Sequence, residues 1–446
     1  MLTSEFISAS AAEPDAGAEP ARKPVRAPKP GKSQHKRQSK RETLLAGAAA
    51  LFNARGIAAT SLADVAEAVG LSRAAVYYYV NDRSELVFQC YSSSCDLTAD
   101  DLANASQEPC GLARILAFVH RAFAPERPQA VVLNDINALG EPLAAMIRTA
   151  NDRNTAALIS FVREGVDDGS IRDCDCEVAA QCVIGMINFA RLSPLWGGGS
   201  SRTYRAHLRD AVLAMVDHGI AAVPVDFNCQ LDADTFLPQR FNAFDRKKAS
   251  ELKQDQLLAE ASRQFNRDGI EATSIDGITR AIGATKGVVY HYMKDKPDLV
   301  ARCYDRAFGI YERIGASGRE HGRNGLERAL LITHLFTQAI LGPVSPLMAQ
   351  PGLDNLPDAQ GKAFRRRAVA MNKLSANFLR EGMADGTCRP CEPMTTTHVF
   401  AGTFGWLPKW VRSDDLRQPR QFADEICNFL AFGLAAKPQD PEEELR

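Results

Sequence analysis

The sequence lacks the features of a membrane-spanning or secreted protein. No stretch approaches the roughly 20 consecutive apolar residues that cross a bilayer. The opening stretch MLTSEFISASAAEPDAGAEP carries acids and prolines, whereas a secretory signal peptide needs a basic start and an apolar run. We therefore expect a cytoplasmic protein that does not enter a membrane.

The cysteines form neither a disulfide framework nor a clear metal motif. There are eleven, an odd number, and they are scattered along the chain, which is typical of a reducing compartment where thiols stay free. Cys388 and Cys391 with His398 come nearest to a zinc motif, but such a site normally has four ligands. The matching place earlier in the chain offers only Cys174 and Cys176. We expect loop cysteines here, no metal and no cofactor.

Motifs of the common enzyme classes are also missing. The chain contains no Gly-x-x-x-x-Gly-Lys, no His-Glu-x-x-His and no Gly-x-Ser-x-Gly. The glycines between Trp196 and Ser200 have no strand before them and no lysine after them, so a loop between helices is favoured over a phosphate site. We expect no enzyme and no catalytic residues. No alternating strand pattern is present either, which favours an all-α fold.

Positive charge is concentrated near the start of a chain whose formal net charge is only −1 at pH 7. Residues 22–41 contain nine basic residues, no acid and several interleaved prolines. Such a run does not fold by itself and suits an arm that follows DNA phosphates or enters a minor groove. A solubilising disordered tail is the alternative interpretation.

One long internal repeat organises the rest of the 446 residues. VYYYVNDRSEL at 76–86 recurs as VYHYMKDKPDL at 289–299, an offset of 213 that also pairs Phe52 with Phe265 and Gly70 with Gly283. FVREGVDDGSIRDC at 161–174 matches FLREGMADGTCRPC at 378–391 with an offset of 217. A period of this length indicates duplication of a whole pair of domains, because solenoid repeats are far shorter.

Three short helices are predicted at the start of each copy. In the first, ETLLAGAAALFNARG has one apolar face and ends at a glycine. Ser61 and Asp64 form a capping-box pattern for a second helix, and a third is expected from about Ser72 to Val80. Two short helices joined by a glycine-containing turn make a helix-turn-helix, whose second helix can enter the major groove of DNA.

Helical spacing places several side chains of the third helix away from the core. Arg73 and Tyr77 lie four residues apart on the outward side, and Lys286 and Tyr290 occupy the same places in the second copy. Ser72 and Thr285 stand at the helix start, where a hydroxyl and free backbone amides can meet a phosphate. The predicted DNA-contacting residues are Thr60, Ser72, Arg73, Ala75, Tyr77, Tyr78, Tyr79, Arg83, Thr273, Thr285, Lys286, Val288, Tyr290, His291, Tyr292 and Lys296.

Arg83 and Lys296 are in that set because of where they stand. Both begin a fourth helix, after Asp82 and Asp295, where a cation is unfavourable by about 0.3 to 1 kcal/mol. A DNA phosphate would reverse the sign of that cost. A solvated cation at a tolerated cost is the alternative interpretation.

The pattern from Thr60 to Leu86, Thr-Ser-x-x-x-x-Ala-x-x-x-Gly-Leu-Ser-x-x-x-Val-Tyr-x-Tyr-x-x-x-Arg-x-x-Leu, resembles the DNA-binding domain of TetR-type transcriptional repressors. The stretch from Thr273 to Leu299 resembles it too, with Gly287 where the family usually has glycine and the first copy has Ala74. The resemblance implies a repressor that binds operator DNA and is released by a small hydrophobic effector. A non-specific architectural DNA-binding protein is the alternative.

The resemblance also implies an organisation for the chain. The helices around 182–195 and 204–220 would pack on those around 396–410 and 421–434, which makes the chain an intrachain pseudo-dimer with a further homodimer possible. The apolar segment between the copies is expected to pack against the body. The expected segments are a disordered basic arm (1–40), helix-turn-helix domain 1 (41–88), helical ligand-binding and dimerisation domain 1 (89–222), a linker (223–245), helix-turn-helix domain 2 (246–302), helical domain 2 (303–436) and an acidic tail (437–446).

The ligand-binding residues cannot be assigned from the pattern. Eight aromatic residues could line effector cavities, but their helical spacing suits plain core as well. They are Phe118, Phe123, Phe189 and Trp196 in the first copy, and Phe336, Phe400, Phe404 and Trp406 in the second.

Overall fold

The structure of the protein is a computed structural model that describes residues 32–193, 199, 201–238, 246–348, 358–412 and 414–436. Residues up to Lys40 form a unit of their own, of which only Lys32–Lys40 at the start of helix α1 is described. Residues 41–446 form the second unit, to which everything below refers apart from the bounds of α1. The rest of the predicted basic arm, the acidic tail and Trp196 lie outside the described residues.

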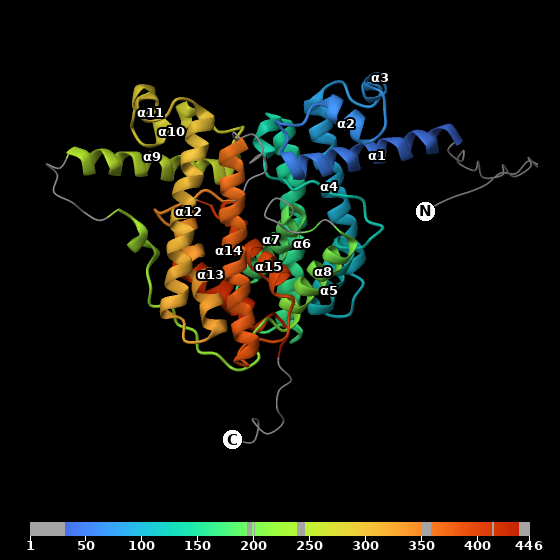
Figure 1. The fold of residues 1–446 in the computed structure, drawn as a ribbon. Helices are drawn as coiled ribbons and strands as arrows, with labels where there is room; N and C mark the ends of the chain where they lie inside the picture. Colours follow the sequence, from blue (N-terminus) through green and yellow to red (C-terminus); the bar gives the residue numbers. More distant parts are fainter. Residues whose placement is uncertain are drawn as a thin grey trace, which may run out of the picture. The chain divides into compact units, whose positions relative to one another are not determined.

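The fold is all-α, as predicted, and the described residues contain no strand apart from two isolated bridges. None of their helices is both long enough and apolar enough to cross a membrane. Figure 1 shows the helices of the two copies. The first copy comprises α1 (Lys32–Arg55), α2 (Leu62–Ala68), α3 (Arg73–Val76), α4 (Arg83–Ala105), α5 (Gly111–Ala122), η1 (Ile136–Leu139), α6 (Leu143–Asp167), α7 (Cys176–Leu192) and α8 (Arg202–Asp217).

The second copy repeats the order of the α-helices after a linking segment. That segment packs as expected in its described part, because Cys229 and Ala233 are buried in the large core and Phe227 and Phe236 lie against it. The segment includes η3 (Ala233–Phe236); the helices that follow are α9 (Arg246–Asp268), α10 (Ile275–Ala281), α11 (Lys286–Tyr292), α12 (Lys296–His321), α13 (Gly325–Leu341), α14 (Asp358–Ala384), α15 (Pro393–Gly405), η5 (Leu407–Lys409) and α16 (Pro419–Phe432).

The third helix of the first copy is shorter than predicted. α3 ends at Val76, and the amides of Tyr78 and Tyr79 bond to the carbonyls three residues earlier, as in a tight turn. The aromatic ring of Tyr78 meets that of Tyr79 edge to face at 5.6 Å. Consecutive bulky rings favour a helix only weakly, because they lose side-chain freedom against the preceding turn. The second copy keeps the longer helix, α11.

The Arg-Glu-Gly-x-x-Asp-Gly stretch of each copy fastens one helix to the next. The carboxylate of Asp168 accepts a hydrogen bond from the amide of Gly111 at the start of α5, at 2.8 Å. Asp385 accepts from Gly325 at the start of α13 in the same way, at 2.9 Å. An acid at these positions satisfies a free amide at the positive end of a helix.

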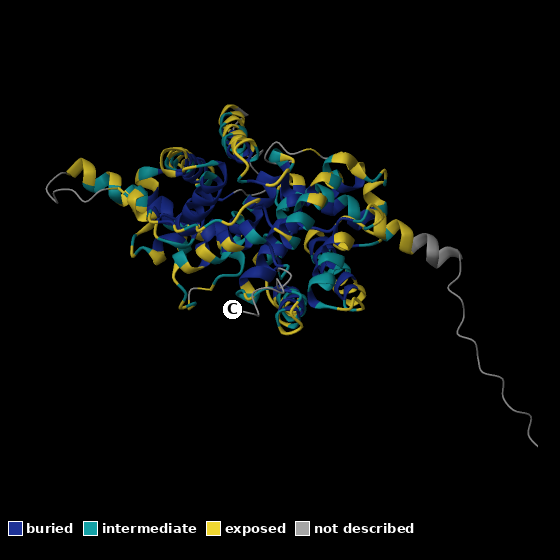
Figure 2. Cartoon of the chain, turned by 90° about the horizontal axis from the view of Figure 1, so that it is seen from below, coloured by how far each residue is buried: buried dark blue, intermediate teal, exposed yellow. Residues whose placement is uncertain are grey.

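The two copies meet where α7 crosses α15 (Figure 1). Gly185 and Gly402 face each other at this crossing, and a methyl group on Gly402 would lie 2.7 Å from the carbonyl oxygen of Gly185. Glycine at both positions lets the two backbones touch. One large core contains helices of both copies, and Figure 2 shows buried residues gathered between them.

Backbone hydrogen bonds join the C-terminal end of each copy to the other copy. The amide of Arg172 bonds to the carbonyl of Leu434 at 2.9 Å, and the amide of Arg389 bonds to that of Ile220 at 2.8 Å. α8 and α16 contact α15 and α7, respectively, and also contact each other. The last helix of each copy therefore contacts the other copy as well as its own.

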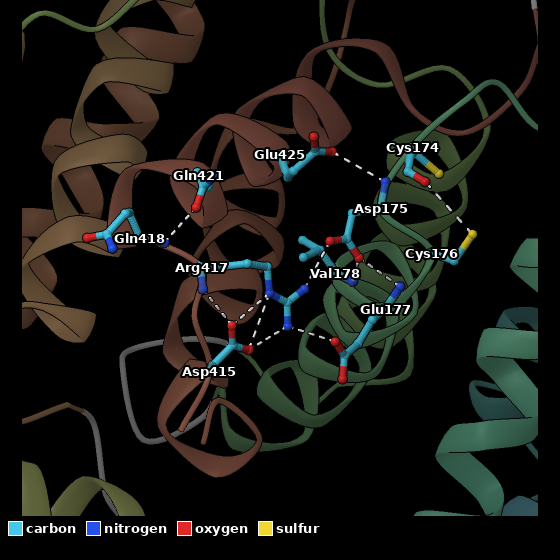
Figure 3. A network of polar contacts seen from close by, with 10 residues as sticks. All are labelled: Cys174, Asp175, Cys176, Glu177, Val178, Asp415, Arg417, Gln418, Gln421 and Glu425. Atoms are coloured by element: carbon cyan, nitrogen blue, oxygen red, sulfur yellow. Dashed lines mark hydrogen bonds and ion pairs between the residues drawn. The ribbon is translucent and has the colours of Figure 1, made fainter. Parts of the chain in front are cut away.

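An arginine network adds an ionic contact between the copies (Figure 3). The guanidinium of Arg417 bonds to Asp175 at 2.9 Å and to Glu177 at 2.7 Å, both at the start of α7, and to Asp415 at 2.6 Å. It also lies 4.4 Å from the centre of the Phe422 ring. The hydrogen bond that Arg417 donates to Asp415 is the largest cause, and with those donated to Glu177 and Asp175 it raises the pKa of Arg417 above its usual value.

A buried histidine links α15 to both copies. His398 is 1% exposed. Its Nδ1 lies 2.5 Å from the hydroxyl of Tyr204 in α8, and its Nε2 lies 3.2 Å from the amide nitrogen of Asn372 in α14. Burial lowers the pKa of His398 to about 4, against an attraction to Glu392 that raises it. The imidazole is therefore neutral at physiological pH.

We predict that His398→Gln reduces the acid sensitivity of the fold. The folded state binds fewer protons than the unfolded state between pH 6.5 and about 4, so stability is lost as pH falls through this range. The loss is at most roughly 3 kcal/mol by the usual conversion of a pKa shift into free energy. Urea unfolding at several pH values measures it, with the exposed His321→Gln as control. Parallel pH profiles for His398→Gln and wild type would contradict the prediction.

Candidate functional site

Apart from the short α3, each helix-turn-helix has the helices and the turn that its sequence predicts. Ser61 caps α2 by accepting from the amide of Asp64, whose carboxylate bonds back to the amide of Ser61 at 2.7 Å. Ser72 caps α3 by accepting from the amide of Ala75. Gly70 in the turn has a φ of 66°, a conformation that favours glycine, and Gly283 has 64° at the equivalent place.

In the first copy, three predicted reading residues at α3 and directly after it face solvent. Arg73 is exposed, and Tyr77 and Tyr78 are 47% and 64% exposed. Val76, on the opposite side, is fully buried. Two exposed phenol rings beside a guanidinium make a surface that can hydrogen-bond to base edges and phosphates.

The second copy presents the same surface with different groups. Tyr290 and Val288 are 54% and 38% exposed, and His291 is exposed beside them. Lys286 forms an ion pair with Asp276 of α10 at 2.7 Å. Such an exposed pair contributes about 0 to 1 kcal/mol, little enough to exchange for a phosphate.

Four members of the predicted set lie inward. Thr60 is 1% exposed and Thr273 is 5% exposed, and their hydroxyls donate to the carbonyls of Gly56 and Gly269. Tyr79 and Tyr292 are partly buried against the cores of their domains. The hydroxyls of the two threonines close the turn after the first helix and are not presented at the surface.

Arg83 and Lys296 have a partner that the sequence did not suggest. The guanidinium of Arg83 donates to the carbonyl of Ala58 at 3.1 Å, and the ammonium of Lys296 donates to that of Glu271 at 3.2 Å. Each cation thus ties the start of the fourth helix to the loop after the first. Burial lowers the pKa of Lys296, against the attraction of Glu271 and Asp135.

A buried asparagine joins each first helix to its helical domain, and sequence reasoning missed it. The amide of Asn53 donates to the carbonyl of Ala130 at 3.0 Å, and its oxygen accepts from the amide of Val132 at 2.9 Å. Asn266 makes the same two bonds to Pro346 and Met348. The repeated Phe-Asn pair in the sequence was the available signal.

The second helix-turn-helix is also held by the first copy. The ammonium of Lys409 donates to the carbonyl of Asn134 at 2.7 Å and to that of Arg267, at the end of α9, at 3.3 Å. Burial lowers the pKa of Lys409 to about 8, against the attraction of Asp135 and Asp268. The amide of Asn137 reaches Asp268 as well, at 3.2 Å.

Each helical domain contains a pocket, and most of the candidate aromatic residues line them. The larger of the two, in the second copy, is lined mainly by apolar side chains, including Phe336, Phe400 and Phe404. The pocket of the first copy is lined by Phe118 and by several polar side chains. Phe189 of the first copy reaches the second pocket, and Trp406 of the second copy reaches the first.

Comparison with known families matches both copies. The family described as bacterial regulatory proteins, tetR family, matches residues 44–90 and 257–303. The family described as tetracyclin repressor-like, C-terminal domain, matches residues 112–191 and 331–434. Together these spans cover more than half of the chain.

Individual relatives match one copy or less. The HTH-type transcriptional repressor KstR2 of Mycolicibacterium smegmatis is 24% identical over 197 residues, which are 42% of this chain and 93% of the relative. The regulator TtgR of Pseudomonas putida is 37% identical over 90 residues, 19% of this chain and 42% of its own. A solved TetR-family regulator from Bordetella parapertussis is 22% identical, with a TM-score of 0.34, covering 41% of this chain and 96% of that one.

We predict that Asn53→Ala and Asn266→Ala each destabilise the chain by about 1 to 3 kcal/mol for every buried backbone group left unpaired. The amide of Val132 should also exchange faster with solvent in Asn53→Ala. Denaturant unfolding and hydrogen exchange measure the two effects. Asn104→Ala is the matched control, because the side chain of this exposed asparagine bonds within α4, to the carbonyl of Asp100. An Asn53→Ala variant as stable as Asn104→Ala would contradict the prediction.

Proposed function

Because this chain belongs to the TetR family of bacterial transcriptional regulators, with two TetR-like units in tandem, we propose that it is a sequence-specific repressor. Both helix-turn-helix units bind one operator, and a small, largely hydrophobic effector releases it. The observation that carries this proposal is the junction of the two copies, in which α7 and α8 pack on α15 and α16. Members of the family that the sequence resembles pair in this way as separate subunits.

The chain then acts as a single-chain pseudo-dimer. Support comes from the glycine contact between α7 and α15 and from the backbone hydrogen bonds of Arg172 and Arg389 that join the two copies. The duplicated anchors Asn53 and Asn266 fix each first helix to its own helical domain. A rigid joint at both places would hold the two reading surfaces at one separation, as an operator with two half-sites requires.

The proposed DNA contacts fall into two kinds. Arg73, Tyr77 and Tyr78 in the first copy, and Lys286, Tyr290 and His291 in the second, are exposed and suit base and phosphate contacts. The remaining predicted residues suit backbone contacts or support: they are Thr60, Ser72, Ala75, Tyr79, Arg83, Thr273, Thr285, Val288, Tyr292 and Lys296. Arg83 and Lys296 would add a phosphate contact to the carbonyl bond that each makes.

The effector would occupy the pockets of the helical domains. The larger pocket is lined by Tyr311, Phe336 and Phe404. The rings of Phe336 and Phe404 are stacked, with their centres 4.9 Å apart. α12, whose side chains Tyr304 and Phe308 reach this pocket, begins at Lys296 beside the reading helix. A ligand that moves α12 would therefore move the second reading surface. We propose no catalytic role and a cytoplasmic location.

An architectural protein that coats DNA without sequence choice is the other candidate. The basic run at 22–41 favours it, since Lys and Arg contacts to phosphate carry no sequence information. Footprinting separates the two functions, because an architectural protein leaves no discrete protected site.

We predict an operator with two unequal half-sites, because residues 73–78 differ from residues 286–291 at four positions: Arg73, Ala74, Ala75 and Tyr78 against Lys286, Gly287, Val288 and His291. Each good base contact is worth about 1 to 3 kcal/mol, enough to fix orientation. Selection of binding sites from random DNA measures the preference.

A variant that makes the two surfaces alike sharpens this test. Arg73→Lys with Ala74→Gly, Ala75→Val and Tyr78→His gives the first copy the reading residues of the second. The selected sites should then become palindromic. A palindrome selected by the wild-type chain, or unchanged sites with the variant, would contradict unequal reading.

A further inference from the structure

The two pockets occupy equivalent places in the duplicated chain. With the offset of 213 for α4 and α12, Cys95 corresponds to Phe308 and Thr98 to Tyr311, and all four residues line pockets. With the offset of 217 for α6 and α14, Asn151 and Asn154 correspond to Ala368 and Met371. These residues line pockets as well. The same offset pairs Phe189 with Trp406, the two side chains that cross between copies.

At these four pairs of positions the first copy carries the more polar group, whereas at Leu158, which corresponds to Ser375, the second copy does. Where the first copy has amides and a hydroxyl, the second has aromatic and aliphatic groups. The charged positions follow the same rule. Arg191 corresponds to Pro408, and Asp101 of α4 corresponds to Ile314, which is fully buried. The duplicated pocket has therefore diverged into one apolar and one polar form.

Two arginines, Arg127 and Arg191, line the polar pocket, and among the described residues only Arg127 has a carboxylate as ion-pair partner. Arg127 bonds to Asp101 at 2.5 Å, and their side chains are 7% and 8% exposed. Arg191 makes a single weak hydrogen bond, to the side-chain oxygen of Asn188 at 3.3 Å. Among the described residues, Arg191 forms no ion pair. Most of its N–H donors are thus left for another partner.

The surroundings of Arg191 disfavour its charge. Burial lowers the pKa of Arg191 to about 9, and the neighbouring charges of Arg127 and Arg205 act in the same direction, against Asp101. Arg205 lies on a neighbouring cavity that Arg127 and Arg191 also line. Three cations therefore gather at this end of the pocket, and an anion bound there would be stabilised by all of them.

We propose that the pocket of the first copy binds an organic anion, an apolar body with one carboxylate or phosphate head, and that Arg191 is its counter-charge. Phe118, Leu158 and Trp406 contact the body of the ligand, and Asn151 and Asn188 are polar residues of the same lining. The pocket of the second copy takes an uncharged ligand. The regulator thus senses two classes of compound at two sites of common origin. This proposal rests on the proposed function in one respect: ligand binding is taken to release the operator.

Direct binding tests the proposal without DNA. The probes are the straight-chain carboxylates from hexanoate to dodecanoate, the matching monoalkyl phosphates and the matching primary alcohols, added to the full chain. Trp406 lines the pocket, so its fluorescence reports binding there, and Trp406→Phe removes that signal. We expect at least one anionic probe to bind and to lose about tenfold or more in affinity in Arg191→Gln, as expected for a charge-assisted contact. The alcohols should change less than about twofold.

The stability of the empty protein gives a second readout. A purely structural arginine stabilises the fold, whereas an arginine kept for an absent anion is a cost, so Arg191→Gln should raise the melting temperature without ligand. Arg163→Gln, an exposed position on α6, is the control and should change neither readout. Failure of every anionic probe, an affinity unchanged in Arg191→Gln, or a lowered melting temperature for that variant would overturn the proposal. If the wild-type chain binds the anion but shows no sequence-specific DNA binding, that result would instead count against the proposed function.

Discussion

The contact between Gly185 of α7 and Gly402 of α15 is the constraint on which the rest of the arrangement depends. Because neither residue has a side chain, the two backbones meet, and the flanking side chains must interdigitate across the crossing. The close approach brings Phe189 into the pocket of the second copy and Trp406 into that of the first. The backbone bonds from Arg172 to Leu434 and from Arg389 to Ile220 also join the two copies. Duplication has thus built an interface inside one chain, where it cannot dissociate.

Two further consequences follow from joining the copies covalently. The halves no longer have to be identical, and they differ both at a predicted reading position, Arg73 against Lys286, and at the pocket residue Arg191, which corresponds to Pro408. One-sided contacts also become possible. Lys409 fastens Asn134 of the first copy to the end of α9 in the second, while the position equivalent to Lys409 in the first copy is Leu192. A symmetric dimer of identical subunits would repeat every contact.

The duplication, the helix-turn-helix units and the all-α class could be predicted from the sequence, because capping boxes, glycine turns and apolar faces are local signals. The roles of Arg83 and Lys296 could not, because the carbonyls that they bind come from a loop distant in sequence. Asn53 and Asn266 were missed for the same reason. The early end of α3 reflects three consecutive tyrosines. The spacing of apolar residues alone does not show that these tyrosines disfavour a helix. Gly185 and Gly402 occupy equivalent positions 217 residues apart, but the sequence does not show that they contact each other.

The central claim is that one chain supplies both halves of the DNA-binding assembly. The most direct measurement is the mass of the complex between the full chain and a single selected operator duplex, by light scattering. The account predicts one chain of 48.6 kDa per duplex, with both half-sites protected from cleavage. Two chains per duplex, or protection of one half-site only, would contradict it.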